Sequence, residues 1–148
     1  MKFTCYIDIN APVGQVLKLF QDPENLQYWQ DGFISYAHTE GNPGAVGSKN
    51  RFMYKTGGRE LELIETIHVN NLPTEFTAEY WSKPMVNLMT NRFETLDENN
   101  TRYISEIEYT QFNGIMPKLM AWMFPGLFKK QVNKWMSQLK EFVENQSS

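Results

Sequence analysis

Cysteine and histidine are scarce in this sequence of 148 residues, which holds one Cys and two His. The single Cys5 excludes an internal disulfide and agrees with a reducing cytoplasm. His38 and His68 fall on separate predicted strands, and neither a His-X-X-X-His nor a Cys-X-X-Cys spacing is present. We therefore expect no metal site and no cofactor, and we interpret both histidines as surface or hydrogen-bonded residues.

Long apolar runs and an excess of positive charge are also missing. No stretch approaches the roughly 20 apolar residues that span a bilayer. The alternating N-terminus MKFTCYIDIN is unlike a signal peptide. The 14 basic and 17 acidic residues give a net charge of −3, whereas nucleic-acid binding needs a concentrated positive surface. We expect a cytoplasmic protein with no nucleic-acid partner and no integral membrane association.

Aromatic residues and methionine are abundant. The chain holds ten Phe, seven Tyr, four Trp and eight Met. Aromatic side chains bury large apolar areas, and methionine fills irregular spaces, so this composition suits either a solid core or a cavity for apolar molecules. The length predicts a single domain over residues 1–148.

Apolar and polar residues alternate with the period of a strand over much of the chain. The first such segment covers residues 3–9, and two short helices follow it, over residues 13–20 and around Trp29. Six further strands are predicted between turn-rich segments, at 33–39, 48–55, 60–69, 74–81, 85–96 and 102–112. Their short connections predict an antiparallel sheet of seven strands.

The helical period returns after Gly114. From Phe128 to Phe142, apolar residues recur every three or four positions, which predicts an amphipathic helix over 128–145 that packs on the sheet. A shorter helical segment over 115–124 precedes it. Pro125 lacks the backbone donor of a continuous helix and therefore predicts a kink between the two.

This order of elements resembles a known superfamily. The stretches IDINAPVGQVLKLFQDPENLQYW (7–29), EGNPGAVGSKNRF (40–52) and QLKEFVE (138–144) are similar to the opening, a strand turn and the terminal helix of the SRPBCC superfamily. This superfamily is also called START or birch-pollen-allergen-like, and the nearest likeness is to uncharacterised bacterial members. The resemblance implies the α+β helix-grip fold, in which a curved seven-stranded antiparallel sheet surrounds a long C-terminal helix.

The resemblance also implies a large cavity between sheet and helix. Members of the superfamily use it for lipids, sterols, polyketides or plant hormones, and some branches are aromatic-ring cyclases or dehydratases. Candidate ligand-binding residues are Leu63, Glu65, Phe76, Tyr80, Met89, Asn91, Phe93, Tyr109, Met116, Met120, Met123 and Phe124. The set is mainly apolar with a few polar groups, as in known ligand pockets, and a solid core remains the alternative.

Glu65 raises the question of catalysis. It shares a predicted strand face with Leu63 and Ile67, where an unpaired carboxylate is strongly destabilising. A partner such as Arg92 or Tyr80 would stabilise it there, whereas a strand bulge would turn it toward solvent. Both arrangements stay open. Glu65 and Arg92 are the only catalytic candidates, because no spacing in the sequence defines a general acid and base.

The segment around Pro125 has two predicted uses. We expect residues 116–128 to form one side of the pocket entrance. In the rival interpretation, Trp122, Phe124 and Leu127 are exposed and form a homodimer contact or a membrane-surface contact. The leading prediction is a protein that binds a hydrophobic or amphipathic small molecule. The alternative is a cyclase or dehydratase that acts on an aromatic polyketide-like substrate in the same cavity.

Overall fold

The computed structural model describes residues 1–146, so the last two residues of the predicted domain lie outside the described range. Within that range the chain forms an antiparallel sheet of seven strands in the order β1-β7-β6-β5-β4-β3-β2. The strands are β1 (Lys2–Ile9), β2 (Phe33–Glu40), β3 (Lys49–Thr56), β4 (Arg59–Asn71), β5 (Glu75–Trp81), β6 (Met85–Asp97) and β7 (Asn100–Phe112). The predicted sheet is confirmed.

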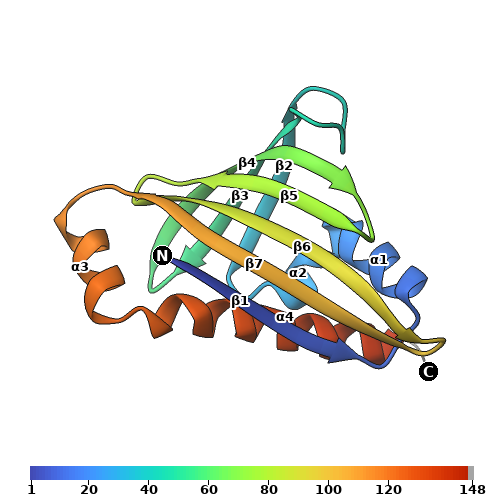
Figure 1. Cartoon of the computed structure of the whole chain (residues 1–148). Coiled ribbons are helices and arrows are strands. Elements are labelled where there is room, and N and C mark those ends of the chain that lie inside the picture. Colours follow the sequence, from blue (N-terminus) through green and yellow to red (C-terminus); the bar gives the residue numbers. More distant parts are fainter. Residues whose placement is uncertain (147–148) are drawn as a thin grey trace.

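The helices are α1 (Val13–Gln21), α2 (Leu26–Trp29), α3 (Ile115–Met123) and α4 (Gly126–Gln146), with a short 3-10 turn, η1 (Pro23–Asn25), between α1 and α2. Figure 1 shows α4 along the concave side of the curved sheet and α3 projecting past the end of the sheet where the chain begins. The predicted kink is a complete break, since α3 ends at Met123 and Pro125 directly precedes α4. The α+β helix-grip prediction is confirmed.

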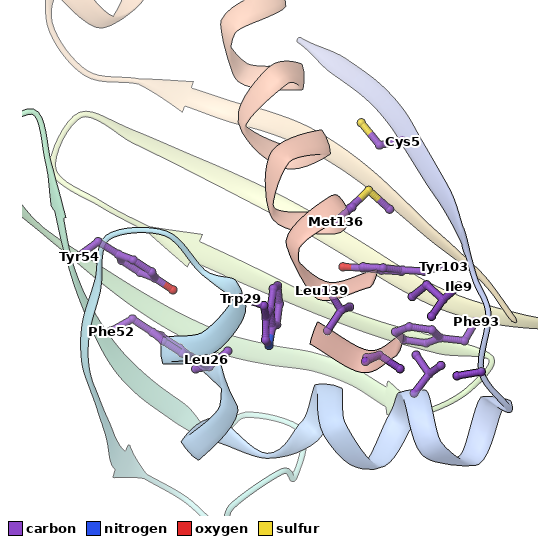
Figure 2. Packing of buried hydrophobic residues seen from close by; sticks show 13 residues of the cluster. Cys5, Ile9, Leu26, Trp29, Phe52, Tyr54, Phe93, Tyr103, Met136 and Leu139 are labelled. Atoms are coloured by element: carbon purple, nitrogen blue, oxygen red, sulfur yellow. The ribbon is translucent and has the colours of Figure 1, made fainter. Parts of the chain in front are cut away.

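The buried core lies under the C-terminal half of α4. Leu139 is fully buried, and Figure 2 shows it between Trp29 of α2 on one side and Phe93 and Tyr103 of the sheet on the other. The rings of Phe93 and Tyr103 stack with their centroids 4.7 Å apart. Phe20 of α1 packs edge-on against Phe93 at 5.0 Å. These contacts anchor one end of α4, while its other end leads to α3.

Polar contacts hold the same half of α4 on β1. Lys140 Nζ donates a 2.8 Å hydrogen bond to the backbone oxygen of Asp8 and also pairs with Glu144. Glu144 in turn accepts a 2.8 Å hydrogen bond from the backbone nitrogen of Asn10. The position of α4 along β1 is therefore defined at its C-terminal end. In residues 1–146, no helix has the length and apolar character needed to cross a membrane.

Candidate functional site

A line of hydrogen-bonding side chains crosses the helix-facing side of the sheet from β2 to β7. Each occupies the position directly opposite the next, in the order His38, Asn50, Glu65, Tyr80, Asn87 and Tyr109. Side chains opposite one another in an antiparallel pair lie about 5 Å apart. We call these six residues the polar row. They share their face with the core residue Phe52, two positions after Asn50.

Glu65 is buried at the centre of the polar row, with 7% of its surface exposed. Its Oε1 accepts a 2.8 Å hydrogen bond from Asn50 Nδ2, and its Oε2 accepts a 2.6 Å bond from the hydroxyl of Tyr80. A bulge does occur in β4, but it falls between Ile67 and Val69, after Glu65. The inward orientation, which the sequence left open, is therefore decided by the strand register.

The surroundings of Glu65 favour its protonated form. Burial raises the pKa of this carboxyl group above its ordinary value, and the hydrogen bonds from Tyr80 and Asn50 offset part of that rise. Among the described residues, no Lys or Arg forms a salt bridge with it. A buried carboxyl group with a raised pKa can take up and release a proton closer to neutrality than an exposed one. This property is common at functional sites.

His38 and Tyr36 extend the hydrogen bonds of the polar row to the edge strand β2. Asn50 Oδ1 accepts a 3.0 Å bond from the hydroxyl of Tyr36 and lies 2.9 Å from His38 Nδ1. His38 Nε2 lies 2.6 Å from the backbone oxygen of Gly41. Because both oxygens are acceptors, the two contacts favour an imidazole with protons on both ring nitrogens and raise the pKa of His38 above its ordinary value. The exposed imidazole of His38 is thus joined to buried Glu65 through one amide group.

The other end of the polar row has an unpaired buried atom. Asn87 Oδ1 is buried and has no hydrogen-bond partner among the described residues, and the same is true of Trp135 Nε1 on α4. Burial raises the pKa of Tyr109 to about 12. Leaving a buried polar group unpaired costs about 1–3 kcal/mol. Asn87 Oδ1 and Trp135 Nε1 are therefore buried polar atoms left unpaired within the described residues.

The sheet residues predicted to bind a ligand all face α4, namely Leu63, Glu65, Phe76, Tyr80, Met89, Asn91, Phe93 and Tyr109. They divide into two groups. Phe93 and Asn91 are buried, and Asn91 Oδ1 accepts a 3.1 Å bond from the Tyr103 hydroxyl. Leu63 and Met89 are half-buried. The less tightly packed part of this face, around Leu63 and Met89, therefore lies toward the end of the sheet that carries α3.

The remaining predicted site residues are elsewhere. Met116, Met120, Met123 and Phe124 lie on or next to α3, where they are exposed by 65%, 37%, 51% and 49%. Arg92 lies on the opposite face of β6 and pairs with Glu106 at 3.2 Å and with Glu94 at 3.8 Å. Arg92 is therefore not the partner of Glu65, which instead bonds to an amide and a phenol.

Four residues of this site were missed in the sequence, namely Tyr36, His38 and Asn50 of the hydrogen-bonded network and Asn87 of the polar row. A signal existed for two of them. Asn50 alternates with the aromatic residues Phe52 and Tyr54, and Asn87 alternates with Met89 and Asn91, which were predicted to line the site. The contact between His38 and Asn50 depends on strand pairing and had no local signal.

Two clefts lie outside the space between the sheet and α4. A cleft of about 580 Å³ separates α1 and α2 from the C-terminal half of α4 and is lined in part by Tyr28 and Phe142. A second, of about 360 Å³, lies between η1, α2 and β2 and reaches Tyr36. Neither is lined by Glu65. Among residues 1–146, no group of three or more His, Cys, Asp or Glu side chains is arranged to hold a metal ion.

No protein-family model and no curated protein matches the chain. Solved structures do match over its full length. TTHA0849 from Thermus thermophilus aligns with a TM-score of 0.80 at 18% identity, with 100% of both chains covered. The ZhuI aromatase/cyclase from Streptomyces sp. R1128 aligns with a TM-score of 0.83 at 11% identity, covering 100% of this chain and 96% of its own. A START superfamily protein from Mycobacterium smegmatis aligns with a TM-score of 0.80 at 10% identity, with 99% of both chains covered.

The chain has the START-like helix-grip fold. The predicted SRPBCC resemblance is thereby confirmed at the level of the fold. At 10–18% identity, the aligned START-like structures establish how the chain is arranged and not what it binds. The function of this protein must therefore be argued from its own residues, above all from the polar row.

Proposed function

We propose that this START-like protein binds an amphipathic small molecule, such as a lipid, sterol or polyketide, on the helix-facing side of its sheet. The observation that carries the proposal is the polar row, which places hydrogen-bonding groups across a largely apolar face and leaves Asn87 Oδ1 unpaired among the described residues. A ligand with a polar group on an apolar skeleton satisfies both parts of this surface. Its skeleton would contact Leu63 and Met89, which are only half-buried without it.

Each polar residue has a distinct role in this proposal. Asn87 donates from its amide nitrogen or accepts at its unpaired oxygen, and Tyr109 offers a neutral hydroxyl because burial raises its pKa to about 12. Glu65 accepts a hydrogen bond when ionised and donates one when protonated. The α3 segment forms one side of the entrance. We place this activity in the cytoplasm, in agreement with the single, buried Cys5.

Native mass spectrometry of protein purified from its own host tests the proposal. A co-purifying mass identifies the class of ligand. Fatty acids, sterols and aromatic polyketides are then titrated while the tryptophan emission is followed, because the ring of Trp135 stacks on Tyr54 of the sheet with the two centroids 5.4 Å apart. Tyr80→Phe should weaken binding, whereas the control Tyr6→Phe should not, since Tyr6 is 63% exposed. Absence of both a co-purified mass and saturable binding would reject the proposal.

One observation favours a second function, that of a cyclase or dehydratase for an aromatic polyketide-like substrate. Glu65 has a raised pKa and a direct hydrogen bond from Tyr80, a combination suited to general acid–base chemistry. In a dehydration, the Glu65 carboxylate would take a proton from the carbon beside a carbonyl group. It would then return that proton to the leaving hydroxyl group, so that water is the net product.

Conversion of substrate separates the two functions. The protein is incubated with a linear polyketide mimic, and a product lighter by one water is sought by mass spectrometry. For an enzyme, Glu65→Gln abolishes the product while binding persists, because the amide keeps the shape of the side chain and loses its basicity. If wild type and Glu65→Gln bind the mimic equally and neither converts it, the protein is a binding protein.

A further inference from the structure

The helix α3 (Ile115–Met123) is apolar on nearly every side, yet none of its residues is buried. Its sequence IMPKLMAWM contains one charged residue, Lys118. A helix that is hydrophobic all round is normally buried in a protein core or in a membrane. The exposure of α3 is therefore the main departure of this structure from ordinary packing, and it calls for a partner outside the described chain.

The exposed apolar residues of the molecule gather on this segment. Of the fifteen large hydrophobic side chains that are exposed in the described part of the chain, eight fall within thirteen residues: Ile115, Met116, Leu119, Met120, Trp122, Met123, Phe124 and Leu127. We call these eight the α3 surface. Ile115 is 83% exposed and Trp122 is 80% exposed. Figure 1 shows α3 beyond the end of the sheet, where a flat partner can approach it.

The charge around the α3 surface has one sign. No acidic residue occurs between Glu108 and Glu141, a stretch that contains five lysines in a chain of net charge −3. Two of the five are paired, Lys134 with Asp31 and Lys140 with Glu144. The other three are exposed and form no salt bridge within residues 1–146, namely Lys118, Lys129 and Lys130.

We propose that the α3 surface docks on an anionic lipid bilayer. Membrane-surface binding draws on buried apolar area and on the attraction of basic residues to anionic lipids, and the α3 surface with its neighbouring lysines offers both. Trp122 would sit at the level of the head groups, where tryptophan is enriched, and Lys118, Lys129 and Lys130 would contact the anionic lipids. This surface contact is distinct from membrane spanning and needs only α3 and the first turn of α4.

Charge distinguishes the bilayer from a second copy of the chain. In a symmetric dimer, the same patch of both subunits meets at the interface. Lys118, Lys129 and Lys130 of one copy would then lie near the same lysines of the other, and like charges repel. An anionic bilayer supplies the opposite charge over a wide area. The bilayer is therefore the partner that satisfies both the apolar and the cationic parts of the surface.

Cosedimentation with vesicles tests this inference on the full chain. We expect the protein to bind vesicles made of an equal mixture of phosphatidylcholine and phosphatidylglycerol. It should bind vesicles of phosphatidylcholine alone only weakly. Salt should weaken the binding, and the tryptophan emission should shift to shorter wavelength as Trp122, now 80% exposed, enters the bilayer surface. Lys118→Gln/Lys130→Gln should lower the affinity about thirtyfold, since each lysine near an anionic surface changes it about fivefold. The matched control is Lys18→Gln/Lys49→Gln, which removes the same charge elsewhere and should leave the affinity unchanged.

The substitution Trp122→Ala tests the contribution of the apolar residues of the α3 surface to vesicle binding. It should lower the affinity for the mixed vesicles about tenfold or more, whereas Val46→Ala, on the β2–β3 loop and 69% exposed, should not. Circular dichroism checks that each variant is folded. Equal binding to both kinds of vesicle, no binding to either, or equal losses in the control variants would overturn the inference. So would a dimer in vesicle-free solution that Trp122→Ala dissociates, because a second copy would then occupy the surface.

Discussion

The hydroxyl of Tyr80 donates a 2.6 Å hydrogen bond to Oε2 of Glu65 from the directly opposite position on the neighbouring strand. Burial raises the pKa of Glu65, and it raises the pKa of Tyr80 well above its ordinary value. A carboxyl group that protonates readily thus lies beside a phenol that keeps its proton. The protonation of Glu65 alone decides whether this pair presents a negative charge to a ligand.

Tyr80→Phe removes one of the two hydrogen bonds that stabilise the ionised form of Glu65. We expect the pKa of Glu65 to rise further. Where Glu65 is ionised, the free energy of unfolding should fall by about 1.5–3 kcal/mol, the usual contribution of a hydrogen bond to a charged group. Carbon-13 NMR of the Glu65 carboxyl and urea unfolding measure the two effects. Tyr6→Phe is the control, and an unchanged Glu65 pKa would contradict the prediction.

Glu65 should make the protein less stable as the pH rises. The unfolded carboxyl group has the ordinary pKa of 4.5, and the folded one has a higher pKa. Between these two values the folded state binds more protons, so the free energy of unfolding decreases with pH. The stabilising contribution is full below 4.5 and is lost as the pH passes the folded value. Glu65→Gln removes the effect.

Urea unfolding of wild type and Glu65→Gln across this pH range measures that difference. The stability of the wild type relative to the variant should decline as the pH increases, because all other groups are common to both proteins. A difference that stays constant with pH would show that the Glu65 pKa is not raised.

His38 should carry protons on both ring nitrogens at a pH where an ordinary histidine is largely neutral. Its hydrogen bond to Asn50 is the main cause of its raised pKa, followed by its bond to Gly41. Its stabilising contribution is therefore present below the ordinary value of 6.5 and is lost as the pH rises through the folded value. Nitrogen-15 NMR measures the titration, and His68→Gln assigns the signals. Asn50→Leu should lower the His38 pKa, and an unchanged pKa would contradict the role of this hydrogen bond.

Asn87 and Asn91 should respond oppositely to replacement by leucine. The two lie on the same face of β6, but Asn87 Oδ1 has no partner in the described chain, whereas Asn91 Oδ1 accepts a bond from Tyr103. Removing an unpaired polar group is neutral or stabilising, while breaking a buried bond costs about 1–3 kcal/mol. Urea unfolding of both variants tests this. Asn87→Leu should also weaken ligand binding, and a large loss of stability in this variant would mean that Asn87 has a structural role.

Two leucines of α4 provide a test of where the core lies. Leu139 is fully buried and Leu127 is 50% exposed. Leu139→Ala should lower the free energy of unfolding by about 2–5 kcal/mol, as buried leucines do, and Leu127→Ala should change it by at most about 0.5 kcal/mol. Equal losses in the two variants would show that the N-terminal end of α4 is packed as tightly as its C-terminal end.

Local periodicity accounts for most of what could be predicted. The alternation in residues 74–81 and 85–96 indicated that Phe76 and Tyr80 share one face, as do Met89 and Phe93, and the structure places all four toward α4. The predicted terminal helix over 128–145 is observed as Gly126–Gln146. These features depend on neighbours within a few positions along the chain, and each is therefore visible in the sequence.

The partners of Glu65 could not be predicted in this way. Asn50 is fifteen positions before it and Tyr80 is fifteen positions after it. These two contacts depend on the turns that join β3 to β4 and β4 to β5. They also depend on the bulge between Ile67 and Val69, which sets the register of β4 with β5. Arg92 shows the same limit, since its partner Glu106 follows from the pairing of β6 with β7. A change of one residue in register would have given each of them different neighbours.

The sequence by itself determined the order of strands and helices, which residues share a strand face, and the apolar character of the segment before Pro125, because these depend on short-range periodicity and backbone chemistry. Only the tertiary structure decided that Glu65 is held between an amide and a phenol and that α3 is left exposed. Both depend on the register and curvature of the whole sheet, which bring together residues that the chain keeps apart.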